Sequence, residues 1–527
     1  MTFIRRIPNK NTGNNYVYEV RSYREKGTQK PKQETVYLGI EVEKDGKKEI
    51  IPPKRMRTGL REILEHGTHM ALYKVATEFN LPEIIEDSLA LSTRIDNIGT
   101  KIVVLAINKI TSDMTIRSVQ NWFSRSSLKD RIDLTSDDLT PKKVRGVLDL
   151  LSETKPDVGG IIEQTITDRI KELYPDDLDV AVYDLTALTY YGEENDLAQY
   201  GHEYQVTGEK QINMVMGVTL KNKLPLHHKT LPGKIVSVST IHSFVKELKL
   251  SGVKNVVLIL DRGFYSKRNI NEIVHSGHNV IGALASHLKI TRSALTKSVK
   301  IENSRNLLKY PDHVVFSKEF KEDDFRVMAY HDVEKKDRQI RSFYEGLAEV
   351  ENRLEEISKE KFDTRTDLDE ELEGICGHYR SYLSFKFKKS YNRWTFTYTL
   401  KHNSIQKTTN KYGKTILFTT TDLSAADVLK TYRERDVIEK VFQLMKKYGL
   451  TPVNSNKEES TRSRILLSYV GYLMLSLLRM KLDEGTSLDS CLKTLGEVRE
   501  ASFSDGSLEL PELTKPQKEI MEMVGLL

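Results

Sequence analysis

The stretch Thr431–Leu450, TYRERDVIEKVFQLMKKYGL, constrains the fold of this chain more than any other part of the sequence. Treated as an α-helix with 3.6 residues per turn, it gathers four polar side chains within an arc of about 60°: Tyr432, Arg435, Glu439 and Lys446. The opposite side is apolar and carries Val437, Ile438, Val441 and Met445. The pattern predicts a helix that presents a carboxylate beside an aromatic ring and two cations. Taken alone, the pattern is more typical of an ordinary amphipathic helix.

Two aspartates upstream each follow a short apolar run. Asp184 follows residues 180–183 (VAVY), and Asp261 follows residues 256–260 (VVLIL). Short runs rich in Val and Ile are typical of buried strands. An Asp at the carboxyl end of such a strand lies where open α/β sheets bind their ligands. Together with Glu439, these carboxylates can hold two divalent cations about 3.5–4 Å apart, the arrangement used for phosphodiester chemistry.

Asp184, Asp261 and Glu439 resemble the DDE triad of bacterial and archaeal insertion-sequence transposases. The helix matches the Y-x2-R-x3-E-x6-K signature of that family at all four positions. The segments YDLTALTYYG (183–192) and LDRGF (260–264) are also similar to the surroundings of the family's first and second Asp.

The resemblance covers residues 178–284 and 415–482, and it implies a ribonuclease-H-like α/β core. In that fold the first and fourth strands are neighbours, so Asp184 and Asp261 would face each other. The implied activity is that of a DNA transposase, which binds the terminal inverted repeats of its element, cleaves the ends and joins the 3′-OH ends to target DNA. The implied cofactor is a pair of Mg²⁺ ions, for which Mn²⁺ can substitute, held by the three carboxylates. Family members act as a homodimer on two paired ends of double-stranded DNA.

The remaining signature positions imply DNA contacts. Arg435 and Lys446 would neutralise phosphates beside the cut. Tyr432 would donate a hydrogen bond to a phosphate or stack on an end base.

The order of apolar runs supports the core on independent grounds. Strands are expected at 179–183, 212–219 and 224–231, then a helix at 238–249, a strand at 255–260, a helix at 266–276 and a strand at 278–284. This β-β-β-α-β-α-β order is that of a ribonuclease-H-like mixed sheet with flanking helices. We therefore assign residues 176–284 and 415–482 to the two parts of the catalytic core.

The long stretch between Asp261 and Glu439 predicts an α+β insertion domain at 285–414. Apolar residues recur there at spacings of 3 and 4: Ile340, Phe343, Leu347, Val350, Leu354 and Ile357. This is an a/d seam of about three heptads. Two interpretations stay open: a helix hairpin with a partner near residues 368–379, or a coiled coil between two copies of the chain.

Alternating residues predict two strands at 382–387 and 392–400. Related transposases use an insertion at this place to grip the transposon end, and some stack a flipped base on an aromatic side chain. By that resemblance Trp394, Lys388 and Arg393 are candidate DNA contacts. The alternative for Trp394 is a half-buried position in the sheet.

The N-terminal residues 1–57 carry the excess of positive charge, with 14 Lys and Arg against 7 Asp and Glu. Such an excess favours phosphate contacts, although a solvated basic surface is the simpler interpretation. Alternating residues around 16–21 and 35–40, with a turn at 44–47, predict a small antiparallel β module whose aromatics either stack on nucleic acid or pack on the sheet. Pro52-Pro53 predicts a linker.

Residues 58–175 are expected to form a helical DNA-binding domain, and residues 483–527 a helical tail. A helix–turn–helix is possible where helices at 101–110 and 115–123 follow one another, although many helix pairs bind nothing. Its second helix would carry Arg117, Gln120 and Asn121.

Several classes of protein do not fit the sequence. The only cysteines, Cys376 and Cys491, are far apart, which argues against a disulfide framework or a structural zinc site. The longest apolar run, residues 465–478, is too short to span a bilayer and indicates a buried helix. With no secretory signal in residues 1–10, we expect a cytoplasmic protein without membrane partners.

Two other functions remain open at this stage. One is a different ribonuclease-H-like DNA nuclease, against which the signature helix and the large insertion argue. The other is a non-catalytic DNA-binding protein derived from a transposase, against which the intact set of carboxylates argues.

Overall fold

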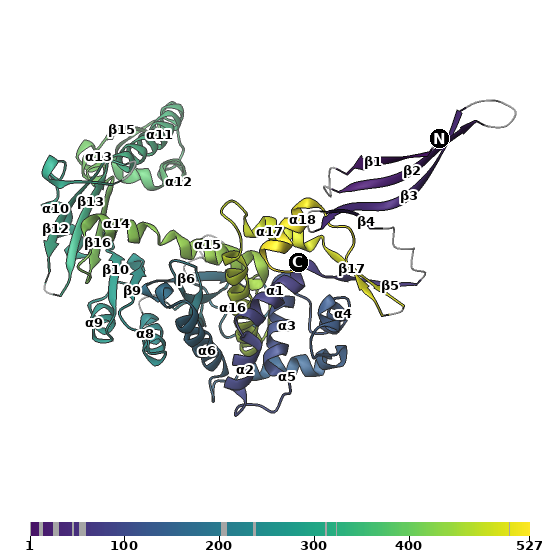
Figure 1. Cartoon of the computed structure of the whole chain (residues 1–527). Coiled ribbons are helices and arrows are strands. Elements are labelled where there is room, and N and C mark those ends of the chain that lie inside the picture. The colour runs from purple at the N-terminus through teal and green to yellow at the C-terminus, as the bar shows by residue number, and fades with distance from the viewer. Residues whose placement is uncertain are drawn as a thin grey trace. The chain divides into compact units, whose positions relative to one another are not determined.

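The computed structural model describes residues 2–9, 14–24, 31–44, 47–51, 59–201, 208–235, 239–310, 313–322, 324–504 and 506–527. Part of the predicted turn at 44–47 and the predicted linker at Pro52-Pro53 lie outside these residues. The chain folds into two compact units. The first comprises Met1–Leu178, Leu185–Ile235 and Val437–Leu527, and the second comprises Asp179–Asp184 and Val236–Asp436. The whole is a mixed α/β protein with many helices (Figure 1).

The N-terminal module is an antiparallel sheet with the strand order β1-β2-β3-β4. Its strands are β1 (Thr2–Pro8), β2 (Asn15–Arg24), β3 (Pro31–Lys44) and β4 (Lys47–Ile51). Val17 and Val20 are fully buried. The rings of Tyr16 and Tyr18 lie 6.0 and 5.1 Å from that of Tyr37, so these aromatics pack on one another within the sheet.

Helices make up most of the remaining first unit. They are α1 (Gly67–Glu78), α2 (Leu81–Leu89), α3 (Ile98–Thr111), α4 (Val119–Ser124), α5 (Pro141–Leu151), α6 (Val158–Leu173) and α16 (Glu458–Met480), with the short 3-10 turns η1 (Ser127–Asp130), η2 (Ser136–Leu139) and η3 (Pro175–Asp179). The predicted second helix of a helix–turn–helix is shorter than expected, because α4 begins only at Val119 and Arg117 precedes it.

Helix α16 is the buried helix that its apolar run predicts. Every residue from Ile465 to Leu478 is buried, and α16 packs against α3. The two helices approach closely at Gly471, where a Cβ atom would meet Cγ2 of Ile110 at 2.4 Å. In the part of the chain that the structure describes, no helix combines the length and the apolar character needed to cross a membrane.

The C-terminal part of the first unit departs from the predicted helical tail. It contains α15 (Asp436–Met445, whose first residue belongs to the second unit), the π-helical turn η8 (Lys446–Leu450), α17 (Leu488–Gly496), β17 (Arg499–Phe503), β18 (Leu508–Glu509) and α18 (Lys515–Met523). Strand β17 pairs with both β18 and β5 (Leu60–Glu65) in a small antiparallel sheet. Thus the tail supplies two strands, and the domain predicted as helical from residue 58 begins with a strand.

The second unit is built on a mixed sheet with the strand order β11-β12-β13-β16-β10-β9-β6. These strands are β11 (Leu307–Leu308), β12 (Val315–Lys321), β13 (Arg326–Asp332), β16 (Lys414–Thr419), β10 (Asn279–Ala283), β9 (Val257–Leu260) and β6 (Val180–Thr189, which continues into the first unit). β6, β9 and β10 run parallel, and the other pairs are antiparallel. In the first unit, β6 is followed across the sheet by β7 (Gln211–Thr219) and β8 (Pro225–Pro232).

The order of elements β6, β7, β8, α8 (Ile241–Leu250), β9, α9 (Lys267–His275) and β10 is the predicted one. The second unit also contains α10 (Lys289–Lys297), α14 (Ala425–Arg433) and the 3-10 turns η5 (Arg262–Phe264) and η6 (Ser304–Asn306). The predicted insertion at 285–414 is not separate from the core throughout, because its strands β11, β12 and β13 belong to the large sheet. β13 lies directly beside β16 and extends the sheet on that side.

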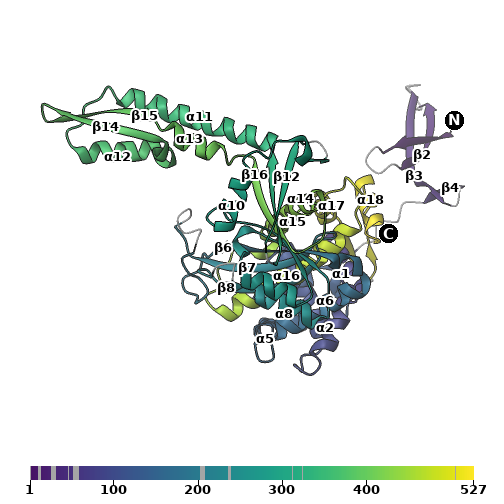
Figure 2. The same ribbon diagram turned by 90° about the vertical axis from the view of Figure 1, so that its left-hand side faces the viewer.

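The rest of the insertion is a helix hairpin covered by a β-hairpin (Figure 2). It comprises α11 (Val333–Ile357), α12 (Arg365–Cys376), η7 (Gly377–Tyr382), β14 (Leu383–Ser390), β15 (Arg393–Leu400) and α13 (His402–Thr409). Val350 and Leu354 of the predicted heptad seam pack against Leu368 and Leu372 of α12 and Phe396 of β15. Elements of the same chain therefore cover the seam, as the hairpin interpretation predicts, and the coiled coil between two copies is wrong.

Candidate active site

Asp184 and Asp261 occupy matching positions on neighbouring parallel strands. The pairing of β6 with β9 ends at Tyr183 opposite Leu260, so the next residue on each strand is one of the two aspartates. Asp261 lies at the carboxyl end of β9, as predicted. Asp184 does not end its strand, because β6 continues beside β7 as far as Thr189. The prediction that Asp184 terminates a strand is therefore wrong. The residue nevertheless lies level with the end of β9.

The Asp261 carboxylate is paired with a signature residue. Arg435 Nη1 lies 2.7 Å from Asp261 Oδ1, and both side chains are partly shielded, with exposed fractions of 18% and 30%. The guanidinium of Arg435 also lies 5.9 Å from the ring centre of Tyr432. Three predicted site residues from two distant parts of the sequence are thus gathered in the second unit.

Tyr432 sits at the edge of a buried apolar cluster that includes Val428 and Leu429 of its own helix. Burial raises the pKa of the Tyr432 phenol to about 12, and among the nearby charges Asp261 and Asp184 raise it while Arg435 lowers it. Because the pKa lies far above neutral pH, the phenol keeps its proton and remains a hydrogen-bond donor.

The signature segment is not one continuous helix. Helix α14 ends at Arg433, a turn follows at Glu434 and Arg435, and α15 begins at Asp436. The Arg435 N–H donates to the carbonyl of Tyr432 at 3.1 Å, which closes a tighter turn than an α-helix allows. The break coincides with long-range ion pairs on both sides: Arg433 with Asp332 and Arg435 with Asp261. The arc predicted for the four signature residues therefore does not apply across residue 434.

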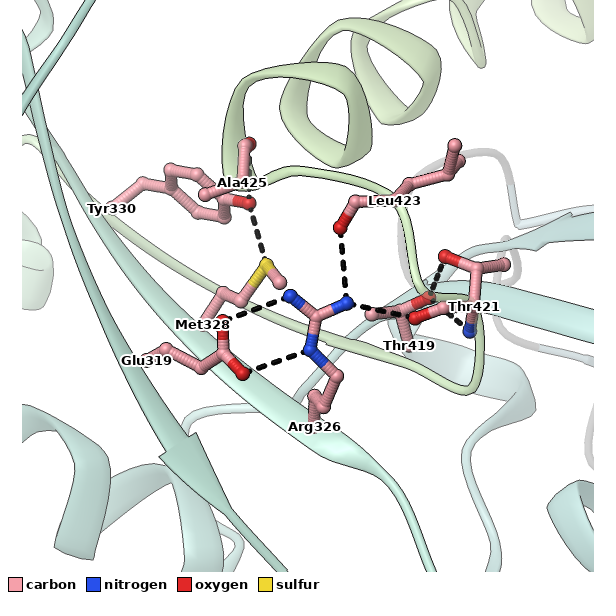
Figure 3. Close-up of polar contacts among 8 residues, drawn as sticks. All are labelled: Glu319, Arg326, Met328, Tyr330, Thr419, Thr421, Leu423 and Ala425. Carbon is pink, nitrogen blue, oxygen red and sulfur yellow. Dashed lines mark hydrogen bonds and ion pairs between the residues drawn. The ribbon is translucent and has the colours of Figure 1, made fainter.

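The start of α14 is anchored by Arg326 on β13, which Figure 3 shows at the centre of a polar network. Its guanidinium pairs with both carboxylate oxygens of Glu319, at 2.8 and 2.9 Å, and donates to the carbonyls of Thr421 and Leu423 at 2.8 and 2.9 Å. Tyr330 donates to the carbonyl of Ala425 at 2.8 Å, at the first residue of the helix. These bonds hold the segment that leads to Tyr432 and Arg435.

Glu439 and Lys446 belong to the first unit. Glu439 is exposed on α15, and of the predicted apolar side Ile438, Val441 and Met445 are buried while Val437 is half-buried. The Lys446 Nζ donates to the carbonyl of Ala187 on the later half of β6, at 3.0 Å.

Gly449 lies near the end of this helical segment and has a φ of +91°. The carbonyl oxygen of Lys109 lies 2.3 Å from where a Cβ atom would stand, so only glycine fits there.

On the insertion, Trp394 takes the half-buried position in the sheet. It packs on the apolar cluster between the hairpins, and its backbone pairs with that of Phe362. Lys388 and Arg393 are exposed on β14 and β15. Tyr391, which the sequence analysis did not single out, is fully exposed in the two-residue turn between these strands. The neighbouring Asn392, a residue that tolerates positive φ, was the sequence signal for that turn.

The donor set at the strand ends suits a hard divalent cation. Carboxylate oxygens are the ligands that Mg²⁺ prefers, and Asp184 and Asp261 are adjacent and partly exposed. Within the described ranges of the chain, no group of three or more His, Cys, Asp or Glu side chains is arranged to hold a metal ion. Two of the three predicted ligands are thus brought together in the second unit, and Glu439 lies in the first unit.

Comparison with known proteins identifies the class. The family model described as "Transposase DDE domain" matches residues 177–474, more than half of the chain. The chain therefore belongs to the DDE transposase family and is a DNA transposase, an enzyme of transposition. Transposases of this family generally use divalent metal ions.

No curated protein shows significant similarity to the chain. Among solved structures, the chain is similar to a piggyBac transposase in a synaptic complex with hairpin DNA. The two share 10% sequence identity and a TM-score of 0.38, over 84% of this chain and 81% of the other.

Proposed function

We propose that this transposase binds the terminal inverted repeats of an insertion sequence, cleaves the DNA ends and joins the freed 3′-OH ends to target DNA. The metal-binding catalytic carboxylates in this proposal are Asp184, Asp261 and Glu439. The observation that carries it is the register of β6 and β9, which sets the first two carboxylates side by side where β9 ends. The core is then ribonuclease-H-like.

Glu439 is the natural third carboxylate because of its place in the chain. Arg435 contacts Asp261 directly, and Glu439 follows it on the first turn of α15. Glu439 is an exposed residue of α15.

The carboxylates would hold two Mg²⁺ ions, with Mn²⁺ as a substitute. When bound, the ions supply activation of the attacking oxygen and stabilisation of the leaving oxygen in an in-line displacement at phosphorus.

Arg435 and Tyr432 orient the groups around that site. A guanidinium has five N–H donors, so Arg435 can hold the Asp261 carboxylate and a phosphate oxygen at once. Tyr432 remains protonated because burial raises its pKa to about 12, so its phenol donates a hydrogen bond to a phosphate or stacks on an end base. Lys446 supplies a further positive charge to the DNA backbone.

The exposed side chains Lys388, Tyr391 and Arg393 make the tip of the β14–β15 hairpin the second DNA contact in this proposal. Trp394 remains a weaker candidate for stacking, because it packs on the apolar cluster of the insertion. We further propose that two copies of the chain act together on a pair of DNA ends. From the resemblance to insertion-sequence transposases, we also propose that the site of action is the cytoplasm of a bacterial or archaeal cell.

The deciding experiment is cleavage of a labelled duplex that carries the element's own terminal repeat, with Mg²⁺ or Mn²⁺ supplied. Wild type is compared with Glu439→Gln, which keeps the shape of the side chain and removes its charge. Glu434→Gln is the matched control, because Glu434 is also exposed and lies in the same segment. We expect metal-dependent nicking at the repeat end by wild type and the control, and none by Glu439→Gln, with DNA binding intact in all three.

Equal cleavage by wild type and Glu439→Gln would remove Glu439 from the site. Binding without cleavage by wild type would instead favour a non-catalytic DNA-binding protein. Nicking at junctions or nonspecific sites, without joining to target DNA, would favour a different ribonuclease-H-like nuclease.

A further inference from the structure

A second group of basic residues lies around a cavity of the first unit. The cavity has a volume of about 210 Å³ and is lined by the loop between β7 and β8, by α15, by the end of α16 and by the start of α17. Three of its lining residues are cations that come from distant parts of the sequence: Lys223, Lys440 and Arg479. None of them belongs to the signature, and the reaction described above does not use them.

Within the described residues, two of the three cations of this cavity form no ion pair. These two cations are Lys223 and Lys440. Burial lowers the pKa of the Lys223 ammonium, and the neighbouring charges of Arg479 and Lys440 lower it further. Asp489 is the only acidic residue among those lining the cavity, and it is engaged by Lys447 at 2.7 Å and by the Tyr448 hydroxyl at 2.6 Å.

The backbone holds Lys223 firmly in this position. Its carbonyl oxygen accepts hydrogen bonds from the Tyr472 hydroxyl at 2.8 Å and from the Ser476 hydroxyl at 3.2 Å. Its φ of +59° is a conformation that residues with side chains seldom adopt. Arg479 donates to the carbonyl of Asn222 in the same loop. Holding these like charges close together costs electrostatic free energy, and a bound anion offsets that cost.

The N-terminus of α17 adds to the positive electrostatic potential in the cavity. Ser487, Leu488 and Asp489 line the cavity at the helix N-terminus, where backbone N–H groups and the helix dipole favour negative charge. A phosphate suits a site of this size and charge, because it accepts hydrogen bonds from several cations at once.

We propose that Lys223, Lys440 and Arg479 together bind a backbone phosphate of the DNA substrate, distinct from the phosphate that is cut. The inference rests on the proposed function in so far as the anion is part of DNA. Lys440 directly follows Glu439 on α15, and neighbouring helical residues point about 100° apart. In the proposal, Lys440 therefore holds its phosphate on another side of α15 from Glu439, and this contact fixes the path of the strand beside the cut.

The test is DNA binding by the full-length protein carrying both Lys223→Gln and Lys440→Gln. The matched control carries Lys221→Gln and Lys229→Gln, which remove the same charge from exposed positions of the same unit. Affinity is measured without divalent metal over a series of salt concentrations, on a duplex with the terminal repeat and on an unrelated duplex.

We expect the Lys223/Lys440 variant to bind both duplexes about tenfold more weakly and to lose about one unit of the slope of log K against log salt, the effect of one phosphate contact. The control should keep the wild-type slope. In the absence of DNA the variant should melt no lower than wild type, because neither lysine forms an ion pair among the described residues and Lys223 is partly desolvated.

An unchanged slope in the variant would overturn the inference, as would a loss of affinity for the repeat duplex alone, which would indicate base recognition. A variant less stable than wild type would also overturn it, because the argument requires uncompensated charge. If wild type fails to cut DNA but the variant still loses affinity and slope, the phosphate site stands while the catalytic proposal fails. If wild type cuts and the variant binds like wild type, only this inference fails.

Discussion

Replacing Glu163 by glutamine should destabilise the first unit by about 3 kcal/mol at neutral pH, and by less as the pH falls. Glu163 lies on α6 and is only 3% exposed. Its carboxylate takes three contacts from β8: His227 Nδ1 at 2.5 Å, His228 Nδ1, and the backbone N–H of His228 at 3.1 Å. The ring of Tyr469 on α16 stacks on His228 at 5.1 Å. One buried carboxylate therefore ties a helix to the sheet.

The magnitude follows from the charge of this group. Burial raises the pKa of Glu163, but the imidazoles of His228 and His227 lower it by more. The net result is a pKa of about 2, compared with an ordinary 4.5. A difference of that size corresponds to roughly 3 kcal/mol of stability. Removing one partner of a buried ion pair costs about 3–5 kcal/mol, which is consistent.

The sign of the pH dependence is also determined. Because the folded-state pKa of Glu163 is lowered, its contribution is present above the unfolded pKa near 4.5 and is lost as the pH falls towards about 2. Wild type and Glu163→Gln should therefore converge in stability over that range. From pH 5 upward, titration of Glu163 no longer changes the difference between their free energies of unfolding.

The assay uses the chain's two tryptophans, Trp122 in the first unit and Trp394 in the second. In a Trp394→Phe background, the fluorescence of buried Trp122 reports urea unfolding of the first unit alone. Glu172→Gln is the control, because that residue is on the same helix but is 67% exposed in its pair with Arg169. A Glu163→Gln variant as stable as this control at pH 7, or a gap that widens on acidification, would refute the reasoning.

Three further outcomes are expected. Arg435→Gln should slow cleavage of the terminal-repeat duplex about a hundredfold. The urea midpoint should stay nearly unchanged, because a partly exposed ion pair contributes about 1 kcal/mol or less to stability. Gly449→Ala should destabilise the first unit more than Gly485→Ala, as followed by tryptophan fluorescence. Both glycines have positive φ, but only the first meets an atom, the Lys109 carbonyl oxygen. Arg326→Gln should speed amide hydrogen exchange in residues 425–433 about tenfold, because α14 loses its anchor, and unchanged exchange there would count against this role.

The elements themselves were largely predictable from local patterns. The apolar runs before Asp184 and Asp261 are strands, and the run at 465–478 is a buried helix. The heptad seam indicated a long helix with one covered face, and α11 is that helix. Side-chain periodicity and β-branched composition act over a few residues, so they are visible without knowing the partners.

The errors have a common cause in long-range contacts. Periodicity predicted one helix through residue 434, but ion pairs of Arg433 and Arg435 with distant aspartates accompany a break there. The end of β6 was placed at Asp184, whereas the strand runs on beside β7. The strands β11 to β13 appeared to belong to an insertion, and pairing with β16 makes them part of the sheet. None of these partners is close in sequence.

The sequence by itself determined which chemical groups this transposase has and in what order: two aspartates after strands, then a glutamate four residues beyond an arginine. Only the tertiary structure decided which of them meet. The register of β6 and β9 sets Asp184 level with Asp261, and the cavity gathers Lys223, Lys440 and Arg479 from three separate segments. The physical reason is that residue type and periodicity are local properties of the chain. Register and the meeting of distant charges depend instead on how all the elements pack together.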